Sequence, residues 1–288
     1  MGSLFAVLVL AALVLLPTPT VPPLVPYPHL YEVVENAAHP LIFALIALLV
    51  LGVGRPWFRR AGRREAAAYA AALGVALLLG ASTELLQLLE ARDGSWEDLI
   101  NDGLGAGFAL SVRAYRDSSP GSTRRRGLIA AASVCLMLII LPLAWAGTAY
   151  LHRYEALPRL WQRHSVLDGY FSHDNGLDYP GLNLEEPFPD WSGYRTLEVV
   201  MVNRSAGPVH LMLRVHDRAH TLAFDDRYNE GFDLAAQSRQ TLVVPLARIE
   251  HAPKGRLLDL RHIAGVIVFR SREDGDRDVA VEEMRLGP

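Results

Sequence analysis

Three apolar stretches of the sequence each contain a polar or ionisable residue that an ordinary membrane-spanning helix would exclude. His39 opens one stretch, Glu84 closes the next, and Asp102 lies inside another. An ionisable side chain within a span costs about 2.5–3.5 kcal/mol on insertion scales, so each one requires a partner or a function. Counted along a helix from the far end of its stretch, each of the three groups lies roughly 21–28 Å from that end. We therefore expect them to meet at one level of a helix bundle.

The spacing of nearby polar residues supports a single cluster. Glu84 and Gln87 are three residues apart and Asp98 and Asp102 are four apart, so each pair shares one face of a helix. Gly105 continues the second face, and small residues allow helices to approach closely. We predict that one membrane cluster contains His39, Glu84, Gln87, Arg92, Asp98, Asn101 and Asp102.

Three interpretations of this cluster remain open. The first is a polar clamp that holds the helices together, and the second is a ligand or substrate site. The third is a site for a hard cation or for protons, but nothing in the spacing is diagnostic of a metal centre. We therefore assign no metal, no cofactor and no catalytic residue, and keep His39, Glu84, Asp98 and Asp102 as catalytic candidates.

The composition points to a membrane protein with a more polar appendage. Of the residues, 51% are hydrophobic and 20% are charged, and the net charge of −3 comes without a basic tail, which argues against nucleic-acid binding. The single cysteine, Cys135, excludes an intrachain disulfide. The sequence contains no G-x-S-x-G, no P-loop and no H-E-x-x-H motif. We expect binding rather than catalysis.

Five apolar runs are candidates for membrane spans, although a signal peptide is the alternative for the first. Arginines gather between the second and third runs and between the fourth and fifth, and the positive-inside rule places both groups in the cytoplasm. If the first run is retained, only five spans satisfy this rule, with the amino terminus inside and the C-terminal half outside. The runs are 3–16, 40–53, 66–80, 99–115 and 127–147.

The C-terminal half changes to an apolar alternation with a period of two, which predicts strands. Strands expected at 197–203, 209–216, 241–246, 263–270 and 279–286 lie close together without helical patterns between them, which favours an antiparallel sandwich of about eight strands, a jelly roll. The predicted fold is a membrane all-α bundle followed by an extracytoplasmic all-β sandwich. Its parts are a four-helix domain (1–126), a fifth transmembrane helix (127–150), a linker (151–165) and the sandwich (166–288).

Polar residues in the sandwich could form a sugar-binding face. Arginine and aspartate hydrogen-bond to sugar hydroxyls, and an aromatic ring can stack on a pyranose. A solvated sheet face is the alternative, and His216 with His220 is a weak zinc pattern because a strand end and a turn rarely present such a pair together. The ligand-binding candidates are Trp191, Tyr194, Arg214, His216, Asp217 and Arg227, and the alternative for Trp191 is a place in the core.

The membrane cluster resembles the VanZ-like family, named for a teicoplanin-resistance membrane protein. That family has a histidine opening one span, then E-x-x-Q with a later arginine, then an aspartate followed by asparagine and glycine. Two departures are Asp102, where the family usually has asparagine, and Asn36, where it often has lysine. The matching residues, within about 5–115, are His39, Glu84, Gln87, Arg92, Asp98 and Gly105.

The VanZ-like resemblance implies a multi-span protein of the bacterial cell envelope, with reduced glycopeptide binding as the associated phenotype. The run 190–194 and the His-Asp-Arg element at 216–218 resemble galactose-binding-like jelly rolls found as carbohydrate-binding modules. We therefore expect an inner-membrane protein whose partners are membrane lipids and a glycan or lipid-linked glycan. The alternative is a membrane enzyme that acts on an envelope lipid headgroup with His39 and the acids. The sequence does not determine the oligomeric state.

Overall fold

The computed structural model describes residues 28–89, 96–176, 178–221, 223–271 and 277–288. The chain divides into two compact units, Met1–Ala146 and Gly147–Pro288. In the described residues the first unit is helical and the second contains all the strands. The apolar run 3–16 lies outside the described residues, so its span stays a prediction.

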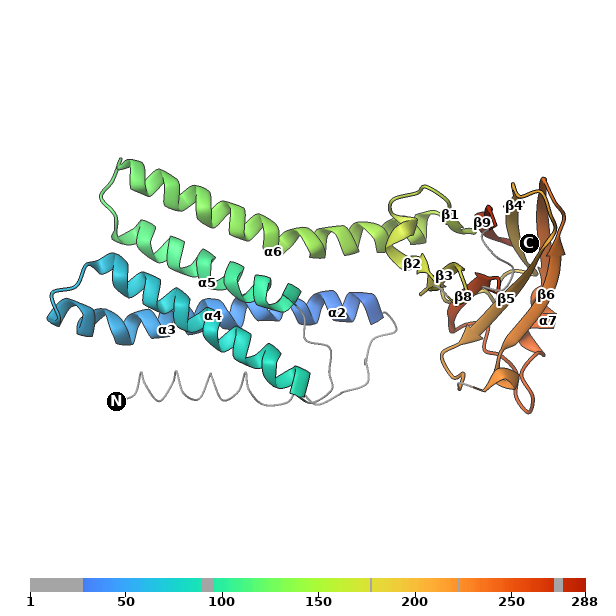
Figure 1. Cartoon of the computed structure of the whole chain (residues 1–288), viewed down its shortest axis with the longest axis horizontal. Helices are drawn as coiled ribbons and strands as arrows, with labels where there is room; N and C mark the ends of the chain where they lie inside the picture. Colours follow the sequence, from blue (N-terminus) through green and yellow to red (C-terminus); the bar gives the residue numbers. More distant parts are fainter. Residues whose placement is uncertain (1–27, 90–95, 177, 222, 272–276) are drawn as a thin grey trace. The chain divides into compact units, whose positions relative to one another are not determined.

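Helices α3, α4 and α5 pack on one another to form the centre of the first unit (Figure 1). Small side chains such as Ala47, Ala72 and Ala106 are fully buried between them beside Phe43 and Ile46, which allows close helix packing. The helices of the chain up to the first strand are α2 (Pro28–Asn36), α3 (Ala38–Arg60), α4 (Glu65–Leu89), α5 (Trp96–Asp117) and α6 (Thr123–Glu155).

Three helical segments of the described residues are long and apolar enough to cross a membrane: Pro28–Arg60, Glu65–Leu86 and Thr123–Glu155. Helix α5 is not among them, because charged residues occupy its first turn and its last two turns. The expected count of five spans therefore stays a prediction.

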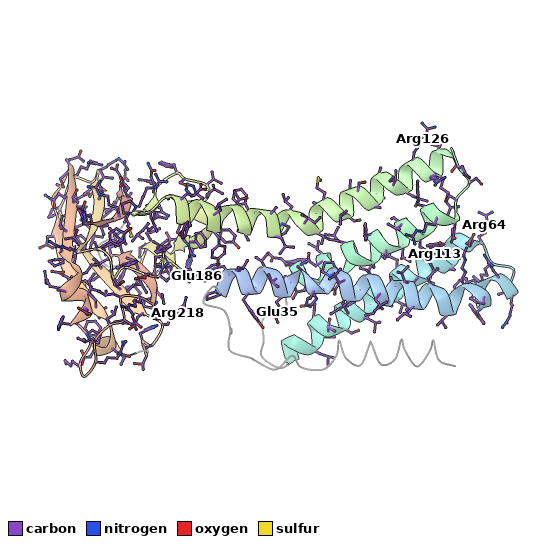
Figure 2. All side chains as sticks on the ribbon, turned by 180° about the vertical axis from the view of Figure 1, so that it is seen from behind. Glu35, Arg64, Arg113, Arg126, Glu186 and Arg218 are labelled. Carbon is purple, nitrogen blue, oxygen red and sulfur yellow. The ribbon has the colours of Figure 1, made fainter. Side chains whose placement is uncertain are left out.

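One end of the helical unit is rich in arginine. The Arg55 guanidinium on α3 lies 2.9 Å from the Asp117 carboxylate at the end of α5, and the Tyr69 hydroxyl on α4 donates to the same carboxylate at 2.8 Å. Figure 2 shows Arg64 and Arg126 at this end of the unit. The two arginine-rich segments of the sequence thus lie at the same end of the bundle.

The second unit is a sandwich of two antiparallel sheets. The four-stranded sheet has the order β1-β9-β4-β7 and the five-stranded sheet has the order β2-β3-β8-β5-β6. The strands are β1 (Arg159–Gln162), β2 (Ser172–Asp174), β3 (Gly181–Glu185), β4 (Thr196–Asn203), β5 (Val209–Asp217), β6 (Tyr228–Leu234), β7 (Ser238–Pro245), β8 (Ile263–Phe269) and β9 (Val279–Gly287).

Alternation of apolar residues builds the core between the two sheets. In β5 the side chains of Val209, Leu211, Leu213 and Val215 are buried and the residues between them are not. The five strands expected from the sequence are confirmed as β4, β5, β7, β8 and β9. Strands β1, β2, β3 and β6 were not predicted.

The segment expected as a linker, 151–165, contains regular structure. Helix α6 continues to Glu155, and β1 begins at Arg159. The Arg153 guanidinium is buried over the rings of Tyr150 and Phe171, each 4.7 Å away, and donates to the Glu186 carbonyl at 2.5 Å. These contacts make the last turns of α6 part of the sandwich unit.

Candidate functional site

Two of the predicted cluster residues form a hydrogen-bonded pair in the helical unit. His39, in the first turn of α3, places its Nδ1 atom 3.1 Å from Oδ1 of Asp102 on α5. Asp102 is 1% exposed, and its second oxygen, Oδ2, has no hydrogen-bond partner among the described residues. The carboxylates of Asp98 and Glu84 lie near enough for their charges to act on His39.

Two glycines leave room for the His39–Asp102 pair. A Cβ atom at Gly80 of α4 would lie 2.5 Å from Oδ2 of Asp102, and a Cβ at Gly105 of α5 would lie 2.0 Å from the Pro40 carbonyl oxygen of α3. Only glycine therefore allows the three helices to approach this closely around Asp102.

The structure describes the other predicted members of the cluster only in part. Asn101 is half-buried on α5, one residue before Asp102. Gln87 lies on α4, but its side chain is outside the described structure, and Arg92 lies outside the described residues. Within the described residues, no group of three or more histidine, cysteine, aspartate or glutamate side chains is arranged to hold a metal ion. The geometry that remains is a histidine–carboxylate pair, which can serve as a clamp or as a general base oriented by its acid.

The sandwich carries a second polar group of residues, on the outer side of the five-stranded sheet. Strand register aligns Asn183, Ile267, Arg214 and Asn229 in one row across β3, β8, β5 and β6. The next row aligns Glu185, Gly265 and His216. We call this surface the five-stranded face; its outward residues are Asn183, Glu185, Met212, Arg214, His216, Arg227, Asn229, Ile267 and Phe269.

Two arginines on the five-stranded face lack an acidic partner. The Nε atoms of Arg214 and Arg227 are buried without a hydrogen-bond partner among the described residues. Burial, followed by the positive charge of Arg227, lowers the pKa of Arg214, and burial also lowers the pKa of Arg227. Arg227 lies 5.8 Å from the centroid of the Phe224 ring, which is a weak cation–π contact. Two like charges are thus held on one half-buried surface.

Two histidines lie beside these arginines. The rings of His216 and His220 are 4.2 Å apart, and a Cβ atom at Gly265 would lie 2.5 Å from the His216 ring. Gly265 therefore allows the imidazole to lie against β8. Burial, followed by the charges of His220, Arg214 and Arg227, lowers the pKa of His216 to about 3, so His216 is neutral at pH 7. A neutral imidazole can donate one hydrogen bond and accept another.

Asp217, predicted as a ligand residue, has a structural role instead. Its side chain is 0% exposed, and its two oxygens accept from the Arg256 guanidinium at 2.6 and 2.9 Å. It also accepts from the Asp259 backbone N–H at 2.7 Å. Because these bonds occupy a fully buried carboxylate, Asp217 cannot contact a ligand in this conformation.

Of the two alternatives for Trp191, the structure shows the place in the core. Trp191 is 0% exposed within the sandwich core, and its indole N–H donates to the Phe188 carbonyl at 2.7 Å. Tyr194 lies in a different place from the arginines, in a shallow hollow with Glu250 and His262. The structure therefore brings together only Arg214, His216 and Arg227 of the six predicted ligand residues.

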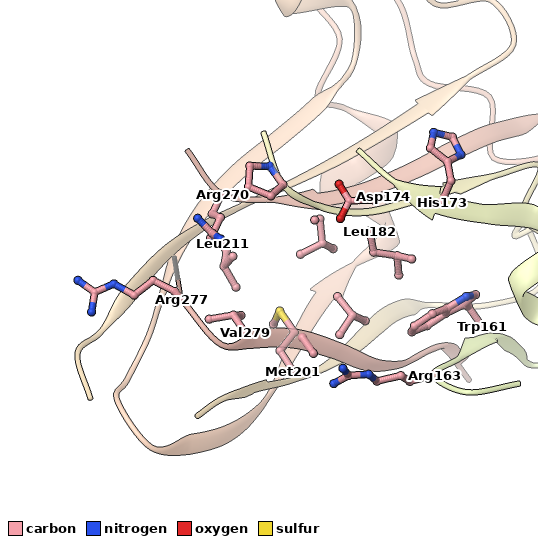
Figure 3. A pocket seen from close by; sticks show the side chains of 15 residues that line it. Trp161, Arg163, His173, Asp174, Leu182, Met201, Leu211, Arg270, Arg277 and Val279 are labelled. Carbon is pink, nitrogen blue, oxygen red and sulfur yellow. The ribbon is translucent and has the colours of Figure 1, made fainter. Parts of the chain in front are cut away.

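A cleft between the two sheets was not predicted from the sequence. It has a volume of about 380 Å³ and an aliphatic floor that includes Leu182 and Met201. Figure 3 shows Trp161 at one end of the cleft and Arg163 and His173 on opposite sides of it. The Trp161 indole donates to the Ser172 hydroxyl at 2.9 Å, which fixes the ring. No local motif marks this cleft, because its lining comes from seven strands.

No family model and no curated protein matches the chain. Among solved structures, an exo-beta-agarase is similar over 38% of this chain and 18% of that chain, with 18% identity and a TM-score of 0.31. The family 11 carbohydrate-binding module from Clostridium thermocellum, in complex with a beta-1,3-1,4-mixed-linked tetrasaccharide, is similar over 38% of this chain and 68% of that chain, with 18% identity and a TM-score of 0.27. The chain thus spans less than a fifth of the agarase. Likenesses of this size carry no argument about activity.

Proposed function

We propose that this chain is a membrane protein of the bacterial cell envelope that binds a glycan or a lipid-linked glycan on the five-stranded face. The observation that carries the proposal is the pair Arg214 and Arg227, whose half-buried guanidinium groups have no acidic partner among the described residues. Around them lie amide, imidazole and aromatic side chains that can bind sugar hydroxyls and ring faces, including Asn183, His216 and Phe269.

The membrane part of the proposal rests on apolar side chains that a folded protein in water would bury. Helix α6 exposes Ile129, Met137 and Leu141, and α3 and α4 expose residues such as Leu41 and Leu78. Contiguous apolar surface on long helices is favourable in lipid and unfavourable in water.

The proposed orientation follows from the arginines. Because Arg64 and Arg126 belong to segments at one end of the bundle, the positive-inside rule favours that end as cytoplasmic. Helix α6 begins at Thr123, beside this end, and its 33 residues suffice to cross a bilayer. The sandwich that follows would then be extracytoplasmic, where envelope glycans are found. The VanZ-like resemblance and the link to glycopeptide resistance belong to this proposal.

Binding of the full chain in lipid nanodiscs to an array of envelope saccharides tests the proposal. We expect at least one saccharide to bind, and Asn183→Trp, which places a bulky ring on the five-stranded face, to weaken that binding about tenfold or more. The matched control is Thr241→Trp, an exposed outward position of β7 on the other sheet, which should leave binding unchanged. If the folded wild-type chain binds no saccharide, or if only the control variant loses binding, the proposal is wrong.

A membrane enzyme that acts on a lipid headgroup is the second candidate, and the His39–Asp102 pair favours it. An imidazole oriented by a buried carboxylate is a common general base. Lipid turnover in nanodiscs of bacterial lipids, measured by mass spectrometry, should then disappear in His39→Gln while the unfolding temperature stays the same. A clamp gives the opposite result, with no turnover in the wild type and a lowered unfolding temperature in Asp102→Asn.

A further inference from the structure

Several arginine side chains on the sandwich are paired with a carboxylate. Arg239 and Arg285 each lie 2.7–2.8 Å from a glutamate oxygen, and Arg256 is held by the buried Asp217. Arg214 and Arg227 differ, because no carboxylate of the described residues lies within ion-pair distance of either one. The charge of Arg227 acts on Arg214, and the charges of both arginines act on His216 and His220.

Two neighbouring cations without a carboxylate partner repel each other unless an anion neutralises their charge. The two guanidinium groups are close enough for the charge of Arg227 to act on Arg214, and both have lost part of their hydration. Each Nε–H is buried without an acceptor among the described residues. A buried donor that lacks an acceptor costs free energy, and a buried like-charge pair adds repulsion.

We propose that the ligand of the five-stranded face carries an anionic group, a carboxylate, sulfate or phosphate, which Arg214 and Arg227 bind together. This inference rests on the proposed glycan binding and specifies the chemical class of the glycan. A guanidinium presents its N–H donors as a planar fork that matches two oxygens of such a group. Two forks, one from β5 and one from the residue just before β6, would give the anion four or more charge-assisted donors, and the anion would supply the missing acceptors.

The neighbouring side chains fit this ligand. Asn229 on β6, directly opposite Arg214, offers an amide, and its own Nδ2 donates to the Phe224 carbonyl at 2.9 Å, which fixes its position. Burial, followed by nearby positive charges, lowers the pKa values of His216 and His220. As a neutral imidazole, His216 can donate a hydrogen bond to a bound anion.

Matched saccharide pairs distinguish the anion and its source. The full chain in nanodiscs is titrated with an oligogalacturonate and its methyl ester, with a sulfated oligosaccharide and its desulfated form, and with a glycosyl phosphate and the corresponding methyl glycoside. We expect the anionic member of at least one pair to bind about tenfold tighter or better, and its affinity to fall as salt is raised. The pair that shows the difference identifies the anion.

Variants of the arginines test which residues bind the anionic group. Arg214→Gln with Arg227→Gln should abolish the preference for the anionic member, whereas Arg239→Gln with Arg285→Gln on the four-stranded sheet should preserve it. Arg214→Lys keeps the charge and loses the fork, so it should weaken anion binding about tenfold while the fold is intact. This variant keeps the test valid if the double variant does not fold.

The outcomes separate this inference from the proposed function. Equal binding of neutral and anionic members overturns the inference and leaves glycan binding standing. Binding of inorganic phosphate or sulfate by the wild type and not by the double variant, without binding of any saccharide, supports the anion site and overturns glycan binding. Absence of all binding to a folded wild-type chain overturns both.

Discussion

The two outer faces of the sandwich differ in how their arginine side chains are paired. On the four-stranded sheet, Arg285 lies 2.7 Å from Glu198 and Arg239 lies 2.8 Å from Glu282, so these two cations each have an anion beside them, while Nε of Arg159 on β1 has no hydrogen-bond partner among the described residues. On the five-stranded face, Arg214 and Arg227 are more deeply buried and have no such partner among the described residues. The first arrangement is typical of a solvated surface, and the second is what a site for an external anion requires.

The largest effect on stability that we expect concerns a buried ion pair. Arg256→Ala should destabilise the sandwich by about 3–5 kcal/mol, because it leaves the fully buried Asp217 carboxylate without its cation. Arg285→Ala, which breaks an exposed pair on the other face, should have a far smaller effect, because solvent screens that pair. Chemical denaturation of the full chain measures both. Equal costs would mean that the burial of the ion pair does not decide its contribution.

A smaller effect concerns the pH dependence of folding. Burial, followed by the charges of His220, Arg214 and Arg227, lowers the pKa of His216 from 6.5 to about 3, and the charge of Asp217 opposes this shift. The unfolded chain therefore takes up a proton at higher pH than the folded chain, so this stabilisation is present above pH 6.5 and is lost as the pH falls toward 3.

We expect the wild type to lose about 1–2 kcal/mol more than His216→Gln between pH 6.5 and pH 4.5. Unfolding temperatures of the two proteins across this range provide the measurement. Parallel pH profiles would show that His216 titrates normally in the folded state.

The smallest expected effect has opposite signs on the two faces. Replacing Arg214 and Arg227 with glutamine should leave stability unchanged or raise it by about 0.2–1 kcal/mol in the absence of ligand, because repulsion is removed. The same change at Arg239 and Arg285 should lower stability slightly, because two ion pairs are lost. A marked loss of stability in the first variant would indicate a structural role for these arginines.

Much of the fold could be predicted from the sequence where one periodicity dominates. The apolar runs 40–53, 66–80 and 127–147 lie within α3, α4 and α6, and the alternation in β4, β5, β7, β8 and β9 identified five strands. Strand β6, Tyr228–Leu234, was missed because it contains asparagine, glycine and aspartate, which disfavour strands, and forms by pairing with β5. Strands β1, β2 and β3 have only three to five residues and no clear period.

The same limits apply to the candidate site. Alternation along β5 correctly separates Arg214 and His216 from the buried residues, but Asp217 falls on the buried side, and its partner Arg256 is 39 residues away. The sequence left Trp191 open between a stacking ring and a core residue, and the ring fills the core. In the helices, the i, i+4 spacing predicts a shared face for Asp98 and Asp102, and the contact of Asp102 with His39 depends on Gly80 and Gly105, which only the packing explains.

Hydroxyl-radical footprinting of the full chain with and without its saccharide tests the location of binding most directly. The account predicts that the saccharide protects Met212 and Phe269 on the five-stranded face from oxidation. Trp161 in the cleft and Tyr194 in the shallow hollow should be oxidised equally in both samples. Protection of Trp161 or Tyr194 with no change at Met212 and Phe269 would contradict the account.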